Sequence, residues 1–144
     1  MNRQGKLLAA AVLLAAFAAP AAAQTAGDPV KGEQVFKKCL ACHKVGPDAK
    51  NGVGPEQNGV VGRHAGTVAG YNYSPLNKAA GENGLIWTEE NLLAYLPDPN
   101  AFLKKFLTDA GKADLAKGAT KMPFKLPKED ERRDVIAYLK TFPQ

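Results

Sequence analysis

The sequence has 144 residues, 45% of them hydrophobic and 23% charged, with a formal net charge of +5 at pH 7. This length suits one domain with one core, and the mild positive charge excludes a nucleic-acid-binding surface. The 14 glycines and 10 prolines are typical of a chain with many turns and short helices. The sequence contains no internal repeat and no long apolar/polar alternation that would indicate a β-sheet.

The first residues of the sequence have the order of a secretory signal peptide. Arg3 and Lys6 precede an apolar run over residues 7–19, and three alanines follow at positions 21–23. A membrane anchor is the alternative, but a spanning helix needs about 20 apolar residues, more than this run supplies. We therefore predict cleavage of residues 1–23, which leaves one domain over residues 24–144. Its location is expected to be the periplasm, and it is not expected to be an integral membrane protein.

Five helices are predicted from capping patterns and apolar periodicity. They begin at Asp28-Pro29, Ser74-Pro75, Thr88, Asp98-Pro99 and close to Lys128. The second is expected to end at Gly81, the third at Pro97 and the last near Phe142. The fold class is therefore all-α, with about five short helices and long loops. These helices carry few apolar side chains for so much loop, which indicates that something else fills the centre.

The two cysteines of the chain lie in the motif Cys39-x-x-Cys42, directly before His43. In an oxidising compartment the two cysteines could form a disulfide or a redox pair. Thioredoxin-like redox pairs follow a strand in a βαβ unit, and the sequence around these cysteines has no such pattern. A zinc site would need both cysteines and both histidines, including His64. Adjacent Cys42 and His43 are poorly placed to bind one tetrahedral ion together.

The motif as a whole is the attachment signature of c-type haem. The two thiols bond to the vinyl groups of the porphyrin, and His43 binds the iron. Residues at i and i+3 share a helix face, so one helical turn is expected to present Cys39 and Cys42 to the same edge of the ring. We therefore predict one covalently attached haem c.

Met122 is the candidate for the second axial ligand. Once Met1 is removed it is the only methionine, and it lies in the Gly- and Pro-punctuated stretch "GATKMPFKLP", 79 residues beyond His43. A lone methionine is often core filler, but this spacing lets the chain wrap a ring and return to its far face. A thioether ligand favours ferrous iron and raises the reduction potential. The alternatives are ligation by His64, predicted to be an exposed turn residue, or an open site.

Six stretches follow one another along the chain: "GDPVKGEQVFKKCLACH", "VGPEQNGVVGR", "YNYSPLNKA", "WTEENLLAYLPDP", "TKM" and "DVIAYLK". Together they resemble the successive blocks of class I cytochromes c, and within them the bacterial c2-type cytochromes, from Gly27 to the C-terminus. The resemblance implies the class I cytochrome c fold, wrapped around one haem. It also implies that Gly32 and Phe36 pack against Val135 and Tyr138 where the first and last helices cross.

The resemblance gives roles to further residues around the ring. The carbonyl of Pro55 accepts the Nδ1 proton of His43 and so fixes the orientation of the imidazole. A second group hydrogen-bonds or neutralises a haem propionate: Arg63, Tyr73 and Trp87. A third group forms the polar network beside the methionine ligand: Asn77, Tyr95 and Thr120.

Two features depart from the family pattern. Gln57 stands where the family usually has leucine, which changes a packing contact with the ring. From Tyr95 to Met122 is 27 residues, longer than in mitochondrial relatives, because a helix after Pro99 and the stretch "TDAGKADLAKG" are extra. This length is typical of a long bacterial variant, and the sequence leaves the conformation between Leu96 and Met122 open.

Two protein ligands on the iron leave no place for oxygen or substrate, so we predict a one-electron carrier and not an enzyme. The alternative is a haem peroxidase or ligand-binding sensor with labile methionine ligation. By resemblance, the donor is a membrane cytochrome bc complex and the acceptor is a terminal oxidase or a photosynthetic reaction centre. The sequence does not choose between these acceptors, and the protein is expected to be a monomer.

Lysines are expected around the exposed edge of the ring: Lys37, Lys38, Lys44, Lys121 and Lys125. A single lysine is usually no more than a solvated side chain. A group of lysines attracts acidic patches on partner proteins and makes the complexes short-lived and sensitive to salt. We therefore predict transient electrostatic docking at this edge, with no nucleic-acid partner.

Overall fold

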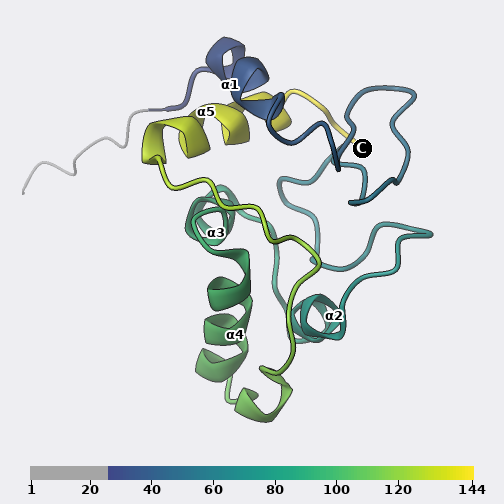
Figure 1. Ribbon diagram of the computed structural model, residues 1–144, viewed down its shortest axis with the longest axis vertical. Coiled ribbons are helices and arrows are strands. Elements are labelled where there is room, and N and C mark those ends of the chain that lie inside the picture. The colour runs from purple at the N-terminus through teal and green to yellow at the C-terminus, as the bar shows by residue number, and fades with distance from the viewer. Residues whose placement is uncertain (1–25) are drawn as a thin grey trace, which may run out of the picture.

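The computed structural model describes residues 26–144, and the predicted signal peptide lies outside these described residues (Figure 1). The helices are α1 Pro29–Phe36, α2 Pro75–Glu82, α3 Glu89–Tyr95, α4 Pro99–Asp109, the 3₁₀ helix η1 Ala113–Leu115 and α5 Glu129–Leu139. Within the described range there is no strand, and His64 and Ile86 form an isolated β-bridge. In the same range no helix combines the length and hydropathy that a bilayer crossing requires. The predicted all-α class, with five short α-helices and long loops, is confirmed.

The first four helices begin where their sequences predict. The side chains of Asp28, Ser74, Thr88 and Asp98 accept hydrogen bonds from first-turn N–H groups that have no partner within the helix. Proline follows three of these caps, at a position where its fixed φ suits the helix and its missing N–H costs nothing. These local signals explain why the starts of the helices are readable from sequence.

The end of α2 differs from the prediction. The helix continues past Gly81 to Glu82, and the turn is made by Gly84, whose φ of +92° suits glycine. A Cβ at Gly81 would lie 2.0 Å from the carbonyl oxygen of Ala65. Gly81 is therefore explained by a close approach between two backbones, not by the end of a helix.

The last helix is shorter than predicted, because α5 ends at Leu139 and not near Phe142. The carbonyl of Phe142 accepts a hydrogen bond of 2.7 Å from the N–H of Gly59. The chain thus leaves the helix to bind a distant loop. Phe142 still contacts Tyr138, with ring centroids 5.0 Å apart.

α1 and α5 cross at the top of Figure 1, so the first and last helices pack against each other. A Cβ at Gly32 would lie 2.0 Å from the carbonyl oxygen of Asp134, so the backbones touch where the chain has no side chain. The rings of Phe36 and Tyr138 pack beside this point with centroids 5.6 Å apart. The implied crossing of the first and last helices is confirmed.

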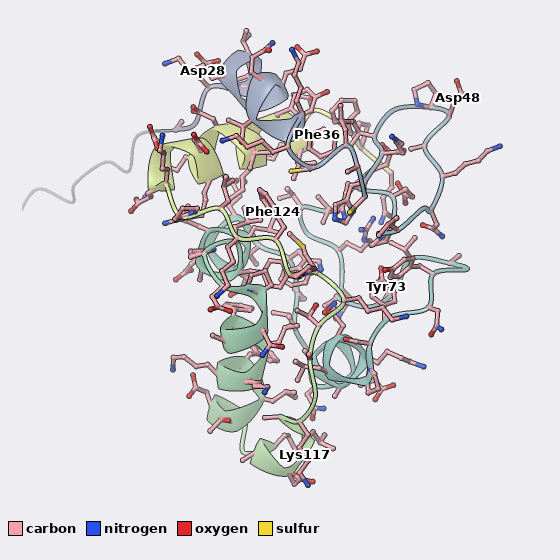
Figure 2. All side chains as sticks on the ribbon, viewed as in Figure 1. Asp28, Phe36, Asp48, Tyr73, Lys117 and Phe124 are labelled. Atoms are coloured by element: carbon pink, nitrogen blue, oxygen red, sulfur yellow. The ribbon has the colours of Figure 1, made fainter. Side chains whose placement is uncertain are left out.

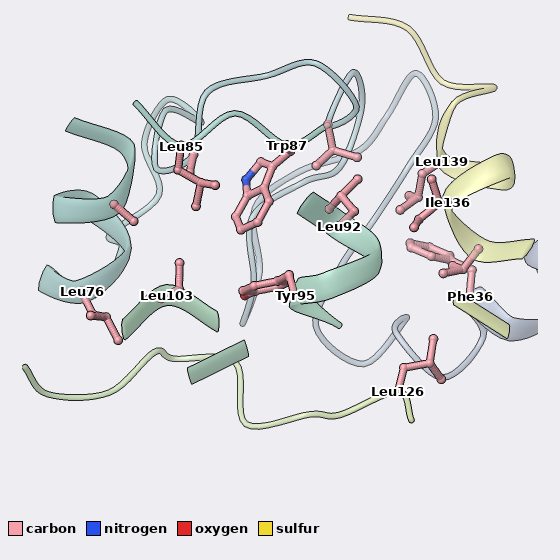
Figure 3. Close-up of a cluster of buried hydrophobic side chains, with 14 of the residues drawn as sticks. Phe36, Leu76, Leu85, Trp87, Leu92, Tyr95, Leu103, Leu126, Ile136 and Leu139 are labelled. Carbon is pink, nitrogen blue, oxygen red and sulfur yellow. The ribbon is translucent and has the colours of Figure 1, made fainter. Parts of the chain in front are cut away.

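Trp87 and Tyr95 lie between two groups of buried side chains (Figure 3). One group contains Leu76, Leu85 and Leu103, and the other contains Phe36, Ile136 and Leu139. The rings of Trp87 and Tyr95 are in contact, with centroids 4.6 Å apart. The aromatic pair therefore connects the two groups within one apolar core, and it borders the cavity that lies there.

Candidate functional site

A cavity of about 290 Å³ lies between the α1/α5 pair, α3 and the loops on either side. Its lining is mainly apolar, and three of its residues, Phe36, Tyr73 and Phe124, come from widely separated segments (Figure 2). All eleven residues predicted to contact a cofactor line this cavity: Cys39, Cys42, His43, Pro55, Arg63, Tyr73, Asn77, Trp87, Tyr95, Thr120 and Met122. The fold thus brings together side chains that span most of the described chain.

Cys39 and Cys42 lie on the turns that follow α1, and no disulfide joins them. α1 ends at Phe36, but the N–H of His43 donates to the carbonyl of Cys39 at 2.9 Å, so one helical turn carries both cysteines as predicted. Cys42 N–H donates to the Cys39 carbonyl at 3.0 Å, which keeps both sulfurs on the cavity side. Burial, followed by the neighbouring Cys42, raises the pKa of Cys39 to about 11. The Cys39 thiol is therefore protonated at neutral pH and forms part of an apolar wall.

The His43 imidazole is held from its outer side. Its Nδ1 lies 2.8 Å from the carbonyl oxygen of Pro55, to which it donates, so Nε2 carries the lone pair. Burial lowers the pKa of His43, an effect that the Pro55 hydrogen bond opposes, and the neutral ring is the form that binds a metal. A Cβ at Gly54 would lie 2.4 Å from Cε1 of this ring. The predicted contact with Pro55 is present, and Gly54 leaves the space that the imidazole fills.

Gln57 makes a polar contact where the family's usual leucine would pack against the ring. Its Nε2 donates to the carbonyl oxygen of Pro55 at 3.3 Å. It also lies 2.9 Å from Nδ1 of His43, which donates to the same carbonyl and so does not accept a hydrogen bond from Gln57. The side chain also borders the cavity. Position 57 therefore belongs to the surroundings of the imidazole.

Met122 lies in the loop between η1 and α5, where Tyr95 of α3 contacts its sulfur and Thr120 of the same loop contacts its backbone. The hydroxyl of Tyr95 donates to Met122 Sδ at 3.5 Å. The N–H of Met122 donates to Thr120 Oγ1 at 3.2 Å. Burial raises the pKa of Tyr95, so its hydroxyl remains a proton donor at any physiological pH. Of the three residues predicted beside the methionine, Tyr95 and Thr120 contact it, whereas within residues 26–144 Asn77 makes no hydrogen bond to it and its Oδ1 has no partner.

The remaining predicted polar residues lie at another part of the lining. Arg63 donates to the carbonyl of Asn58 at 2.7 Å and lies 3.7 Å from the carboxylate of Glu56, so its charge is already partly compensated. The Tyr73 hydroxyl accepts a hydrogen bond of 3.3 Å from the N–H of Val68. Burial lowers the pKa of Arg63 and raises the pKa of Tyr73.

Asn77 gives an independent sign that the cavity receives a polar partner. It is buried on α2, and its Oδ1 has no hydrogen-bond partner among the described residues. A buried amide oxygen without a partner costs about 1–3 kcal/mol. A ligand or water with a proton to donate would remove this cost.

The five predicted docking lysines do not share one environment. Lys38 pairs with Glu131 and Lys125 with Asp98, each at 2.6 Å. The other three donate to neutral oxygens: Lys37 to Gln34, Lys44 to the carbonyl of Leu40 and Lys121 to the carbonyl of Asn72. Only Lys38 and Lys121 border the cavity itself.

The folded chain does not bring together the four ligands that a zinc site would need. His64 pairs through its backbone with Ile86 and does not border the cavity. Over residues 26–144, no three His, Cys, Asp or Glu side chains gather to hold a metal ion. The donors at the cavity are instead two thiols, one imidazole nitrogen and one thioether sulfur, set in apolar walls. This set fits a flat apolar ring with a central iron.

The model of the Cytochrome c family matches residues 29–143, which is most of the chain. The chain therefore belongs to the cytochrome c family. It is 72% identical over 116 residues to cytochrome c2 iso-1 of Rhodospirillum centenum, covering 81% of this chain and 97% of that protein. A cytochrome c2 of Rhodopseudomonas palustris is 62% identical over 114 residues, covering 79% of this chain and 97% of the relative.

Solved structures agree with the sequence relatives. The structure of cytochrome c2 from Rhodospirillum centenum aligns with a TM-score of 0.81 at 69% identity, covering 82% of this chain and all of that one. The ferricytochrome c2 structure from Rhodopseudomonas palustris aligns with a TM-score of 0.76 at 61% identity, covering 80% of this chain and 98% of that one. Within its family this chain is thus a class I cytochrome of the c2 type, with the class I fold. It is an electron-transfer protein with one covalently attached haem c, and not an enzyme.

Several residues that shape the site were not predicted. Gly54 was missed although it adjoins Pro55, because a glycine's role depends on what lies against it. Tyr71 donates to the carbonyl of Val53 at 2.8 Å and so joins two loops beside the cavity. Its spacing of two from Tyr73 was a signal, but the spacing alone does not reveal the contact.

Proposed function

We propose that Cys39 and Cys42 are the attachment points of the haem, and that His43 and Met122 are the two axial ligands of its iron. The observation that carries this proposal is the cavity itself, which both thiols, the imidazole and the thioether border together. When bound, the haem supplies an iron that accepts and releases one electron. Pro55 orients the imidazole, and Tyr95 donates a hydrogen bond toward the thioether sulfur.

The surrounding residues support electron transfer without substrate chemistry. Two side-chain ligands exclude water and small oxidants from the iron. Phe36, Leu92 and Leu139 give the cavity an apolar, closely packed lining that changes little when the charge of the iron changes. The free oxygen of Asn77 is available to a polar group inside. These features together favour a fixed site with small rearrangement on transfer.

We propose further that the protein is a soluble monomer in the periplasm, exported through residues 1–23. It would carry electrons from a membrane cytochrome bc complex to a terminal oxidase or a photosynthetic reaction centre. Supporting this are the signal-peptide pattern and the lysines Lys37, Lys38, Lys44, Lys121 and Lys125. Three of these lysines meet only neutral oxygens and so keep an uncompensated charge for docking.

Replacement of the proposed ligand tests the ligation. In holoprotein, Met122→Ala should abolish the weak far-red band that reports sulfur bonded to ferric haem iron. It should also lower the reduction potential strongly and open the iron to cyanide. Phe124→Ala, two residues along the same loop and also at the cavity, is the matched control and should keep the band. An unchanged band and potential in Met122→Ala would remove Met122 from the ligand set.

Charge reversal tests the docking surface. Lys121→Glu should slow association with membranes that contain a cytochrome bc complex at low ionic strength, and the difference should shrink with added salt. Lys117→Glu makes the same charge change at the far end of the molecule from Tyr73 and Phe124 (Figure 2) and should have a smaller effect. Equal effects of the two variants, or rates indifferent to salt, would argue against docking at this edge.

A further inference from the structure

The loop that carries Met122 has little backbone support of its own. Between Gly118 and Lys125, within the described part of the chain, no residue makes a backbone–backbone hydrogen bond. The next such bond joins the N–H of Leu126 to the carbonyl of Leu96 at 2.8 Å. The position of Met122 therefore depends on side chains that reach the loop from other elements.

The first turn of α4 supplies two of these side chains. Oδ1 of Asn100 accepts a hydrogen bond of 3.0 Å from the N–H of Thr120. Asp98 pairs with Lys125 at 2.6 Å, on the other side of Met122 in the chain. One helical turn in the extra segment thus holds the loop on both sides of the methionine.

Asn100 is not explained by the needs of its own helix. Asp98 already caps α4 by accepting from the N–H of Ala101, and Pro99 occupies the first helical position. Asn100 occupies the second helical position, and its side chain takes no part in capping the helix. Its half-buried side chain points instead to Thr120, whose backbone it binds.

The contact leads to the methionine in one further step. Thr120 Oγ1 accepts from the N–H of Met122 at 3.2 Å, and the Thr120 side chain also meets the hydroxyl of Tyr95. Fixing the backbone of Thr120 therefore fixes the group that orients Met122. Without this contact, the loop would be held mainly by the Asp98–Lys125 ion pair and the Tyr95–Met122 hydrogen bond, with no contact left at the backbone of Thr120 from α4.

We infer that Asn100 is a positioning residue for Met122, and that α4 sets how firmly the methionine is held at the cavity. This inference rests on the proposed function, in which Met122 is an axial ligand. It gives the extra segment between Tyr95 and Met122 a role in ligation: the segment restrains a loop that has little hydrogen bonding of its own.

The test uses ferric holoprotein and the rate at which cyanide displaces the sixth ligand. Asn100→Ala removes the oxygen that accepts from Thr120. Asn100→Ser has a shorter side chain that does not reach Thr120 but still suits a helix start. Both should bind cyanide faster than the parent protein by about two- to tenfold, the range that loss of one net hydrogen bond supports. The far-red band should weaken at a lower temperature in both. Asn100→Asp keeps an oxygen in place and should restore the parent rate.

The matched control is Asn91→Ala on α3. Asn91 donates to the carbonyl of Ile86 at 2.7 Å and is not hydrogen-bonded to the Met122 loop, so its loss should leave cyanide binding unchanged. Parent-like rates in Asn100→Ala or Asn100→Ser would overturn the inference, and so would Asn100→Asp behaving like Asn100→Ala. If Asn100→Ala does not fold, Asn100→Ser and Asn100→Asp still decide the question.

Met122→Ala distinguishes a failure of the ligand assignment from a failure of the positioning role of Asn100. If this variant keeps the far-red band, the ligand assignment fails, and with it the basis of the role of Asn100. If Met122→Ala loses the band while the Asn100 variants match the parent protein, the ligand assignment stands and only the positioning role is overturned.

Discussion

The two walls of the cavity hold their proposed ligands in opposite ways. On the His43 side, backbone bonds between neighbouring segments make the frame: His43 N–H donates to Cys39, Gly54 N–H to Cys42 and Gln57 N–H to Lys44, each at 2.9 Å. On the other side, the Met122 loop depends on side chains from α3 and α4, and α5 holds the residues that follow it. A backbone frame tolerates many side-chain changes, whereas a loop held by side chains is sensitive to each of them.

The largest effect is expected when the space that the backbone frame leaves for the His43 imidazole is filled. Gly54→Ala would place a Cβ 2.4 Å from Cε1 of His43, so the imidazole or the loop must move. We expect a loss of about 1–3 kcal/mol in the free energy of unfolding and a shifted reduction potential. Gly52→Ala, in the same loop, meets nothing closer than 3.6 Å and is the control. Urea unfolding and potentiometry of both holoproteins would measure these two changes. Equal stability of the two variants would show that the loop around His43 adjusts to the added Cβ at little cost.

An effect of similar size, without a change in the surroundings of His43, is expected where α5 holds the residues that follow the Met122 loop. The buried Arg132 donates to the carbonyls of Leu126 and Pro127 at 3.1 and 2.5 Å. Arg132→Met keeps the apolar stem but leaves both carbonyls without this donor, which should cost roughly 1–3 kcal/mol of stability. Arg133→Met, which removes a helix-surface pair with Glu129, should cost well under that amount. Thermal unfolding measures the difference, and similar midpoints would mean that the loop does not need α5.

The smallest expected effect depends on pH. The hydrogen bond from Lys125, followed by the N–H of Ala101, lowers the pKa of Asp98 in the folded protein. The stability from this group is therefore complete above the unfolded value of about 3.9 and is lost as pH falls through the lower folded value. Asp98→Asn, which keeps an N-cap, should lower the urea midpoint slightly at pH 7 and progressively less between about pH 5 and pH 3.

Asp109→Asn on the same helix is the control for that measurement, because it removes the exposed pair with Lys105 and touches no loop. A difference between Asp98→Asn and the parent protein that persisted unchanged into acid would show that the ion pair with Lys125 does not support the Met122 loop.

Local patterns in the sequence predicted the starts of the helices well. Four caps, Asp28, Ser74, Thr88 and Asp98, hold their own first turns, so each depends only on neighbouring residues. The end of α5 was not predictable in this way, because the bond between Gly59 and Phe142 joins residues far apart in sequence.

The cavity residues were predicted for a different reason. The Cys-x-x-Cys-His motif identified Cys39, Cys42 and His43, and ligand chemistry identified Met122. Resemblance to class I cytochromes c identified the other seven, and the structure places all eleven at one cavity. What resemblance did not supply lies where the chain departs from the family: the close approach of Gln57 to His43 and the contact of Asn100 with Thr120. Both depend on distances between segments that no spacing in the sequence expresses.

The crossing of α1 and α5 has a consequence for the order of assembly. Asp28 and Asp134, joined by a hydrogen bond of 2.7 Å, are 106 positions apart. Closing so long a segment costs entropy that only the finished crossing repays, and a chain still being synthesised lacks its last helix. We therefore expect Cys39 and Cys42 to stay accessible to a prosthetic group until the last helix packs against the first.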